Sequence, residues 1–150
     1  MLGVEDIVEI NQLMSLYGHL ADAAKFTPVD SPAQQRLAEV FTDDAEYDST
    51  LAGGPMSRGL AEIRGMFSTP KPSHPPAHQC TNVYVYEDDG VVRVASKWII
   101  SDWDHGVVAV GKYQDVVVRQ DGGWRIKQRV ALLDSGRPAE NTTQSAADAS

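Results

Sequence analysis

The sequence has little of what marks several large protein classes. Its 150 residues include a single cysteine, Cys80, so no internal disulfide can form, and a buried structural thiol is expected there. Basic residues are outnumbered, with 13 Lys and Arg against 21 Asp and Glu, and the formal net charge is -8. Nucleic acids and anionic membrane surfaces attract basic proteins, so this charge argues against both as partners.

Membrane spans, metal-ligand clusters and phosphate loops are not expected either. No run approaches the ~18 apolar residues that can span a bilayer, and the acidic start MLGVEDIVEI is unlike a secretion signal, so we expect a cytoplasmic protein. His74 and His78 are four residues apart, but Pro75 and Pro76 exclude the helix that would bring them together. No glycine-rich loop leads from a strand into a helix. The sequence therefore predicts neither a metal site nor another cofactor.

The composition is that of an ordinary globular domain. Hydrophobic residues make up 42% and charged residues 23%, and 150 residues suffice for a real core. We expect one domain over residues 1–134. Residues 135–150 are rich in Ser, Thr, Ala and Asn without an apolar pattern, so we expect a disordered tail there.

The first half of the chain predicts three helices and a short strand. In residues 4–24 apolar side chains recur at steps of three and four, which is typical of an amphipathic helix, while Asp22 falls on its solvent side. A second helix, capped by Ser31, is expected to run to about Phe41, a short strand to cover 45–50, and a third helix to cover 60–67. The inward stripe of the first helix consists of Ile7, Ile10, Leu13, Met14, Tyr17, Leu20, Ala21 and Ala24.

The second half predicts four long strands joined by tight turns. They cover residues 78–87, 91–103, 107–119 and 124–133 and form an antiparallel meander. Side chains alternate along a strand, so Trp98, Ile100 and Asp102 share one face. Asp102 is then either at a solvated strand end or at the mouth of a pocket.

Helices followed by a meander predict an α+β fold. Long strands twist and curve strongly, so we expect a cone-shaped barrel of a curved mixed sheet, with the three helices enclosing a pocket for a small hydrophobic ligand. Residues 107–118 are apolar on both faces, which favours a homodimer or higher homo-oligomer through the sheet.

Several phrases, in this order, resemble the SnoaL-like branch of the nuclear transport factor 2-like superfamily over roughly residues 4–133. They are the first helix with Tyr17 and Asp22, LAEVFTDDAEYD at 37–48, SRGLAEIRGMF at 57–67, HQCTNVYVYEDDGVVRVASKW at 78–98 and GKYQDVVVRQDGGWRIKQR at 111–129. Dehydratases, isomerases, cyclases, hydrolases and pure binding proteins share this fold.

Within that family the pattern is similar to scytalone dehydratase and the bile-acid 7α-dehydratases. The resemblance implies that Tyr17, Asp22 and His78 belong to an active site, joined by Asp102 in a W-x-x-x-D context. Scytalone dehydratase has a second histidine that this chain lacks on the corresponding strand. The steroid-type arrangement is therefore favoured.

These residues suggest a metal-free dehydratase of hydroxylated polycyclic or ketone substrates such as steroids or polyketides. His78 would be the base, Asp22 would orient it, and Tyr17 would donate a hydrogen bond to the carbonyl oxygen. Asp102, among apolar neighbours that would raise its pKa, would be a second acid or base. The expected substrate-binding residues are Tyr47, Met66, Phe67, Asn82, Trp98 and Ile100.

Other interpretations remain open at this point. The same acid–base groups fit a ketosteroid-isomerase-like isomerase or a polyketide cyclase, and the pocket fits a protein that only binds a small ligand. Tyr17, Tyr47, Met66, Phe67 and Trp98 also fit ordinary core positions. His78 and Asp22 fit surface positions, and Asn82 fits a strand-edge hydrogen bond.

Overall fold

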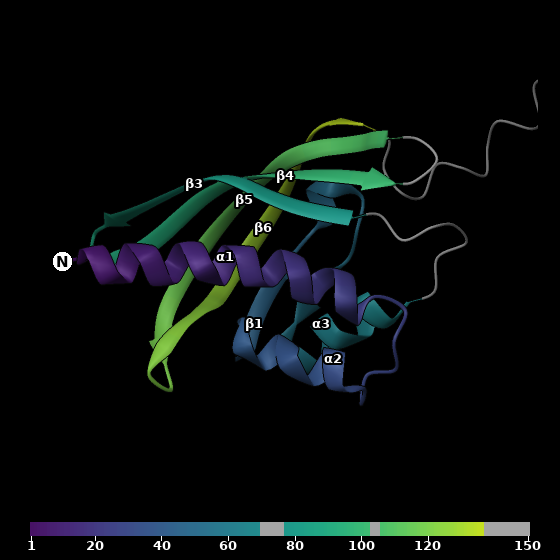
Figure 1. The fold of residues 1–150 in the computed structure, drawn as a ribbon, viewed down its shortest axis with the longest axis horizontal. Helices are drawn as coiled ribbons and strands as arrows, with labels where there is room; N and C mark the ends of the chain where they lie inside the picture. The colour runs from purple at the N-terminus through teal and green to yellow at the C-terminus, as the bar shows by residue number, and fades with distance from the viewer. Residues whose placement is uncertain (70–76, 103–105, 137–150) are drawn as a thin grey trace, which may run out of the picture.

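The computed structural model describes residues 1–69, 77–102 and 106–136, and within them the chain has the expected α+β fold (Figure 1). Three α-helices accompany a six-stranded sheet of order β2-β1-β6-β5-β4-β3 in this described part. The sheet is mixed, because β1 is parallel to β6 while the other neighbours are antiparallel. It curves strongly but does not close into a barrel, since β2 and β3 form its two edges.

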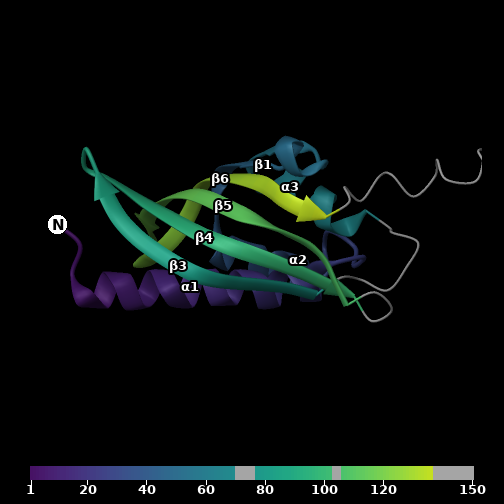
Figure 2. The same cartoon turned by 90° about the horizontal axis from the view of Figure 1, so that it is seen from above.

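Helix α1 covers Val4–Ala24, as predicted, and lies along one face of the sheet (Figure 2). Its predicted apolar stripe is buried with one exception. Ile7 is 40% exposed, because burial of the helix begins one turn later, at Ile10. No helix in the described residues is long and apolar enough to cross a membrane.

The second predicted helix ends earlier than expected. It consists of α2 (Pro32–Gln35), capped by the Ser31 hydroxyl, and a 3-10 turn, η1 (Arg36–Glu39). Phe41 already belongs to β1 (Phe41–Asp48), because it pairs with Ile126 of β6 and the Ile126 amide donates to the Val40 carbonyl at 2.7 Å. Sheet pairing therefore overrides the local helical pattern. A 3-10 turn η2 (Thr50–Ala52), strand β2 (Met56–Arg58) and helix α3 (Gly59–Ser68) follow.

The four predicted long strands are present. They are β3 (Ala77–Asp88), β4 (Val91–Asp102), β5 (Gly106–Gln120) and β6 (Gly123–Gly136), and each pairs with the next. Some predictions fall on residues that lie outside the described ranges: Trp103, the turn at 104–105, His74 and residues 137–150 of the tail.

Two of the register shifts in the sheet change which side chains of β3 and β6 face inward. In β3 the pairing with β4 shifts between Thr81 and Tyr84. In β6 the pairing with β5 shifts where Ile126 and Gln128 oppose consecutive residues of β5. Each shift inserts an extra residue, so the side-chain alternation changes face at that point.

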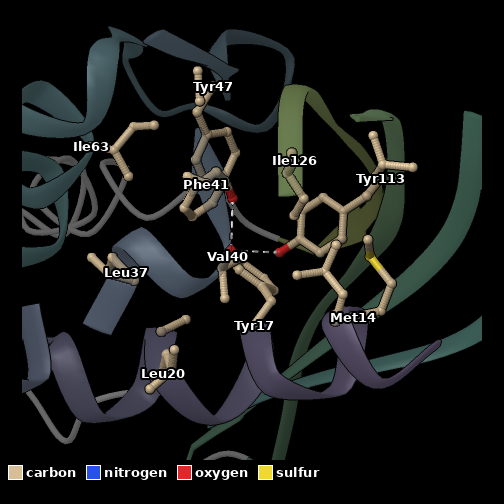
Figure 3. Packing of buried hydrophobic residues seen from close by; sticks show 14 of the residues in the cluster. Met14, Tyr17, Leu20, Leu37, Val40, Phe41, Tyr47, Ile63, Tyr113 and Ile126 are labelled. Carbon is tan, nitrogen blue, oxygen red and sulfur yellow. Dashed lines mark hydrogen bonds between the residues drawn. The ribbon is translucent and has the colours of Figure 1, made fainter. Parts of the chain in front are cut away.

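The core lies between α1 and the inner face of the sheet (Figure 3). Met14, Tyr17 and Leu20 of α1 meet Phe41 of β1 and Tyr113 of β5, and all five are buried. On the other face, Tyr84 is 66% and Tyr86 37% exposed. The structure therefore places the apolar interior next to the end of α1 that carries the predicted site residues.

Candidate active site

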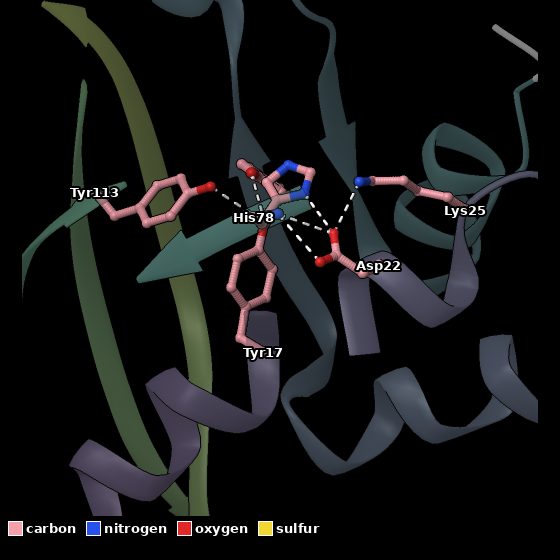
Figure 4. A network of polar contacts seen from close by, with 6 residues as sticks. Tyr17, Asp22, Lys25, His78 and Tyr113 are labelled. Atoms are coloured by element: carbon pink, nitrogen blue, oxygen red, sulfur yellow. Dashed lines mark hydrogen bonds and ion pairs between the residues drawn. The ribbon is translucent and has the colours of Figure 1, made fainter. Parts of the chain in front are cut away.

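Asp22 and His78 form a hydrogen-bonded pair between the last turn of α1 and the start of β3 (Figure 4). The His78 Nδ1 atom lies 2.9 Å from Asp22 Oδ1, and the His78 amide donates to both carboxylate oxygens at 3.1 Å. The two elements approach closely there, because a Cβ on Gly18 would lie 3.4 Å from the His78 carbonyl oxygen. The helical wheel places Asp22 on the solvent side and does not reveal this contact: the side chain is still 35% exposed, but β3 passes beside it.

The electrostatics of this pair favour an ionised carboxylate. Burial alone would raise the pKa of Asp22, but hydrogen bonds from His78 and Lys25 and the Lys25 charge outweigh it and lower the pKa below its ordinary 3.8. A carboxylate accepts the Nδ1 proton of a neutral imidazole. The basic nitrogen of His78 is then Nε2, the arrangement that a general base requires.

Three tyrosine hydroxyls meet in the interior. Tyr17 of α1 lies 3.0 Å from the hydroxyl of Tyr47 of β1 and 3.4 Å from that of Tyr113 of β5. Burial raises the pKa of all three above the ordinary 10.0, so they remain protonated donors. Each hydroxyl can donate one proton and accept others, so the three tyrosines form one hydrogen-bonded cluster. Figure 4 shows the Tyr17 and Tyr113 hydroxyls pointing toward the region of His78.

A buried ion pair holds these tyrosines. Arg129 donates from Nε and Nη2 to the two oxygens of Asp115 at 2.7 and 2.8 Å, and both side chains are completely buried. The guanidinium also lies 3.9 Å from the ring centroid of Tyr17 and 4.0 Å from that of Tyr113. Burial alone would lower the pKa of Arg129, but the Asp115 carboxylate outweighs it, so Arg129 stays protonated.

Sheet register explains why these groups meet. Arg129 pairs with Asp115 of β5 on one side and with Tyr47 of β1 on the other. Tyr113 lies two residues before Asp115 on the same buried face of β5. Neighbouring strands therefore supply all members of the cluster except Tyr17.

The other predicted site residues have different surroundings. Ile100 pairs with His78 across β3 and β4. Trp98 is 3% exposed and donates from Nε1 to the Lys112 carbonyl at 3.1 Å. Phe67 is buried and Met66 is half-buried on α3. Asp102 ends β4, but its side chain lies outside the described residues.

Asn82 is not brought to the site. It is exposed at the register shift of β3, with φ at 52°, and its Oδ1 accepts from the Thr81 hydroxyl at 3.1 Å. Asparagine tolerates this left-handed conformation better than most residues. The position of Asn82 is thus explained by the bulge.

The described residues contain no group of three or more His, Cys, Asp or Glu side chains that could hold a metal ion.

Comparison with known proteins identifies the family. A family model described as a SnoaL-like domain matches residues 3–130. The chain belongs to the SnoaL-like family. The resemblance seen in the sequence is confirmed, and it covers nearly the whole described part of this SnoaL-like chain. No curated protein sequence matches it.

Solved structures share the fold of this SnoaL-like protein. A candidate aromatic ring hydroxylase from Novosphingobium aromaticivorans is 26% identical, with a TM-score of 0.69 over 90% of this chain and 93% of that one. A candidate scytalone dehydratase from the same organism is 19% identical, with a TM-score of 0.64 over 90% and 88%. LinA is 18% identical, with a TM-score of 0.68 over 90% of each chain. The last two similarities support the fold alone.

Sequence reasoning did not select four residues that the structure places in or beside the candidate site, Lys25, Tyr113, Asp115 and Arg129. Strand alternation already puts Tyr113 and Asp115 on one face, so that signal was present in the sequence. Arg129 had no such signal, because regular alternation from the buried Trp124 places it on the opposite face. The register shift in β6 turns it inward.

Proposed function

We propose that this SnoaL-like protein is a cofactor-independent dehydratase that removes water from a hydroxylated polycyclic or ketone-bearing substrate such as a steroid or polyketide. The observation that supports this most is the Asp22–His78 contact of 2.9 Å, with His78 only 15% exposed. An imidazole oriented by a carboxylate at the edge of an apolar interior is a suitable base for a carbon acid. The resemblance to SnoaL-like dehydratases agrees with this assignment.

The reaction needs a base, a hydrogen-bond donor and an acid. His78 Nε2 removes the proton next to the substrate carbonyl, and Asp22 stabilises the imidazolium that forms. A hydroxyl of the Tyr17 cluster donates to the carbonyl oxygen as it becomes negative. The electron pair then forms the C=C bond while the β-hydroxyl leaves as water, protonated either by His78 with the proton it has removed or by Asp102 as a second acid.

An isomerase is the second candidate, and the described residues offer a reason for it. His78 supplies a base and the tyrosine cluster supplies an oxyanion donor, and these two groups suffice to move a proton from one carbon to another. Deuterium from solvent that enters the product without loss of water would favour an isomerase or a cyclase. A ligand that binds without any exchange would favour a binding protein.

The test is turnover of a panel of β-hydroxy ketones, including steroids, followed by mass spectrometry for loss of water. We expect His78→Gln to lower kcat by ~10²-fold or more, because a general base contributes about that much. Asp22→Asn should also lower kcat, since it removes the charge that stabilises the imidazolium. His19→Gln is the matched control, because His19 is an exposed histidine on the same helix as Asp22. Equal turnover by His78→Gln and the control would refute the proposed role of His78.

We also propose that the protein is a homodimer formed through the face of the sheet opposite α1. That face carries the exposed Tyr84 and Tyr86, whose rings stack at 5.5 Å. In the views of Figures 1 and 2, α1 lies on the other side of the sheet. Exposed aromatic side chains of this kind are enriched at protein interfaces.

A further inference from the structure

The Asp22 carboxylate has two cationic or potentially cationic partners. Lys25 Nζ lies 2.8 Å from Asp22 Oδ1, and His78 Nδ1 lies 2.9 Å from the same oxygen (Figure 4). The Lys25 side chain is only 9% exposed, although lysine is rarely so buried. An ammonium group removed from water needs a charged partner, so the contact with Asp22 is a built feature of the site.

We propose that Lys25 is a positioning residue of the acid–base pair. By sharing Asp22 Oδ1 with His78, it reduces the negative charge available to stabilise a protonated imidazole. His78 is thereby kept neutral, and ready to accept a proton, down to a lower pH than an unshared pair would allow. The effect of Lys25 on catalysis rests on the proposed function. The effect of Lys25 on the protonation of His78 through Asp22 does not.

The groups around His78 leave Asp22 and Lys25 as its principal charged neighbours among the described residues. From α1, Asp22 contacts the imidazole, and Lys25 at the end of the helix contacts the same Asp22 oxygen. From β4, Ile100 is its cross-strand partner and does not titrate. From β5, Tyr113 is neutral, because burial raises its pKa well above 10.0.

A purely structural role would give a different result. Lys25 is the C-cap residue of α1, and a cation at the end of a helix also stabilises it through the helix dipole. Loss of that effect would lower thermal stability without changing the protonation of His78. The decisive measurement is therefore the titration of the His78 imidazole.

The experiment is an NMR pH titration of histidine side chains in the wild type, Lys25→Met and Lys25→Arg. Lys25→Met keeps the apolar stem of the side chain and removes its charge. If Lys25→Met does not fold, Lys25→Gln takes its place. His78→Gln identifies the NMR signal of the His78 imidazole. We expect the His78 midpoint to rise by ~0.5–1 pH unit in Lys25→Met, and to stay near the wild type in Lys25→Arg, which keeps the charge. The exposed His19 is the internal reference and should not move. An unchanged His78 midpoint in Lys25→Met would overturn the proposal.

A second measurement connects the coupling to turnover. The acidic limb of the kcat/KM profile should move up with the His78 midpoint, so Lys25→Met should lose ~3–10-fold at acidic pH and little on the alkaline plateau. If the His78 midpoint shifts in Lys25→Met but no substrate is turned over, the coupling of Lys25 to His78 stands and the proposed enzymatic function is wrong. If Lys25→Met turns over substrate with an unshifted pH profile of kcat/KM, the proposed enzymatic function stands and the proposed role of Lys25 is wrong.

Discussion

At the scale of single residues, the Arg129–Asp115 pair dominates the energetics of the interior. Both side chains are 0% exposed, so both charges have lost their hydration. Moving each ion out of water costs several kcal/mol, which only good geometry offsets. The bidentate contact and the rings of Tyr17 and Tyr113 provide that geometry. Removing one partner would leave the other charge buried alone.

We therefore expect Arg129→Met to lower the free energy of unfolding in urea by about 3–5 kcal/mol. The double variant Arg129→Met/Asp115→Leu should recover most of that loss, because neither charge is then left unpaired. Arg119→Met is the control, since its side chain is 46% exposed beside Asp6 and Glu9, and it should destabilise the protein far less than Arg129→Met. A double variant no more stable than Arg129→Met would contradict the account.

At the scale of elements, periodicity was sufficient for α1, α3 and the four long strands. The buried Val94, Ser96 and Trp98 alternate with the exposed Lys97 as the sequence pattern predicted. What periodicity did not locate were the register shifts in β3 and β6, because a regular alternation continued through an inserted residue assigns the wrong face beyond it. They explain why Asn82 is a bulge residue and why Arg129 faces inward.

The contact between α1 and β3 was the other feature that local patterns could not provide. Asp22 lies off the apolar stripe, so a helical wheel assigns it to solvent. It is partly covered by a strand whose contacting residue, His78, lies 56 residues further along the chain. The family resemblance selected both Asp22 and His78, which the coordinates place in contact, whereas their neighbour Lys25 emerged only from the coordinates.

Two glycines test the packing of β5 and α3. A Cβ at Gly111 would overlap the Leu132 carbonyl and the Trp98 ring, whereas a Cβ at Gly65 would meet nothing within 4 Å. Gly111→Ala should therefore destabilise the protein by at least ~2 kcal/mol through overpacking. Gly65→Ala should stabilise it by ~0.5–1 kcal/mol, because alanine restricts the unfolded chain and favours the helix. Thermal denaturation of both variants checks this, and similar melting temperatures would contradict the close approach of Trp98 to β5.

At the scale of the whole molecule, the second face of the sheet has the character of an interface. Two rows of side chains cross β3 to β6 in register on this face. They are Tyr86, Arg93, Val116 and Gln128, and next to them Tyr84, Ala95, Gln114 and Val130. Several of these residues, including Tyr86, Val116 and Val130, line an open groove. A two-fold dimer places the same face of both copies together, so such a mixture of aromatic, apolar and polar groups can complement itself.

The double variant Tyr84→Asp/Val116→Asp should convert the proposed dimer to a monomer. In a two-fold interface each substitution occurs on both partners, so four carboxylates would be brought together and desolvated. Light scattering coupled to size-exclusion chromatography measures the mass directly. Val8→Asp is the control, because Val8 is 55% exposed on α1, which lies along the other face of the sheet. A wild type of monomeric mass would exclude the dimer, and a dimer that Val8→Asp alone dissociates would move the interface to the helix.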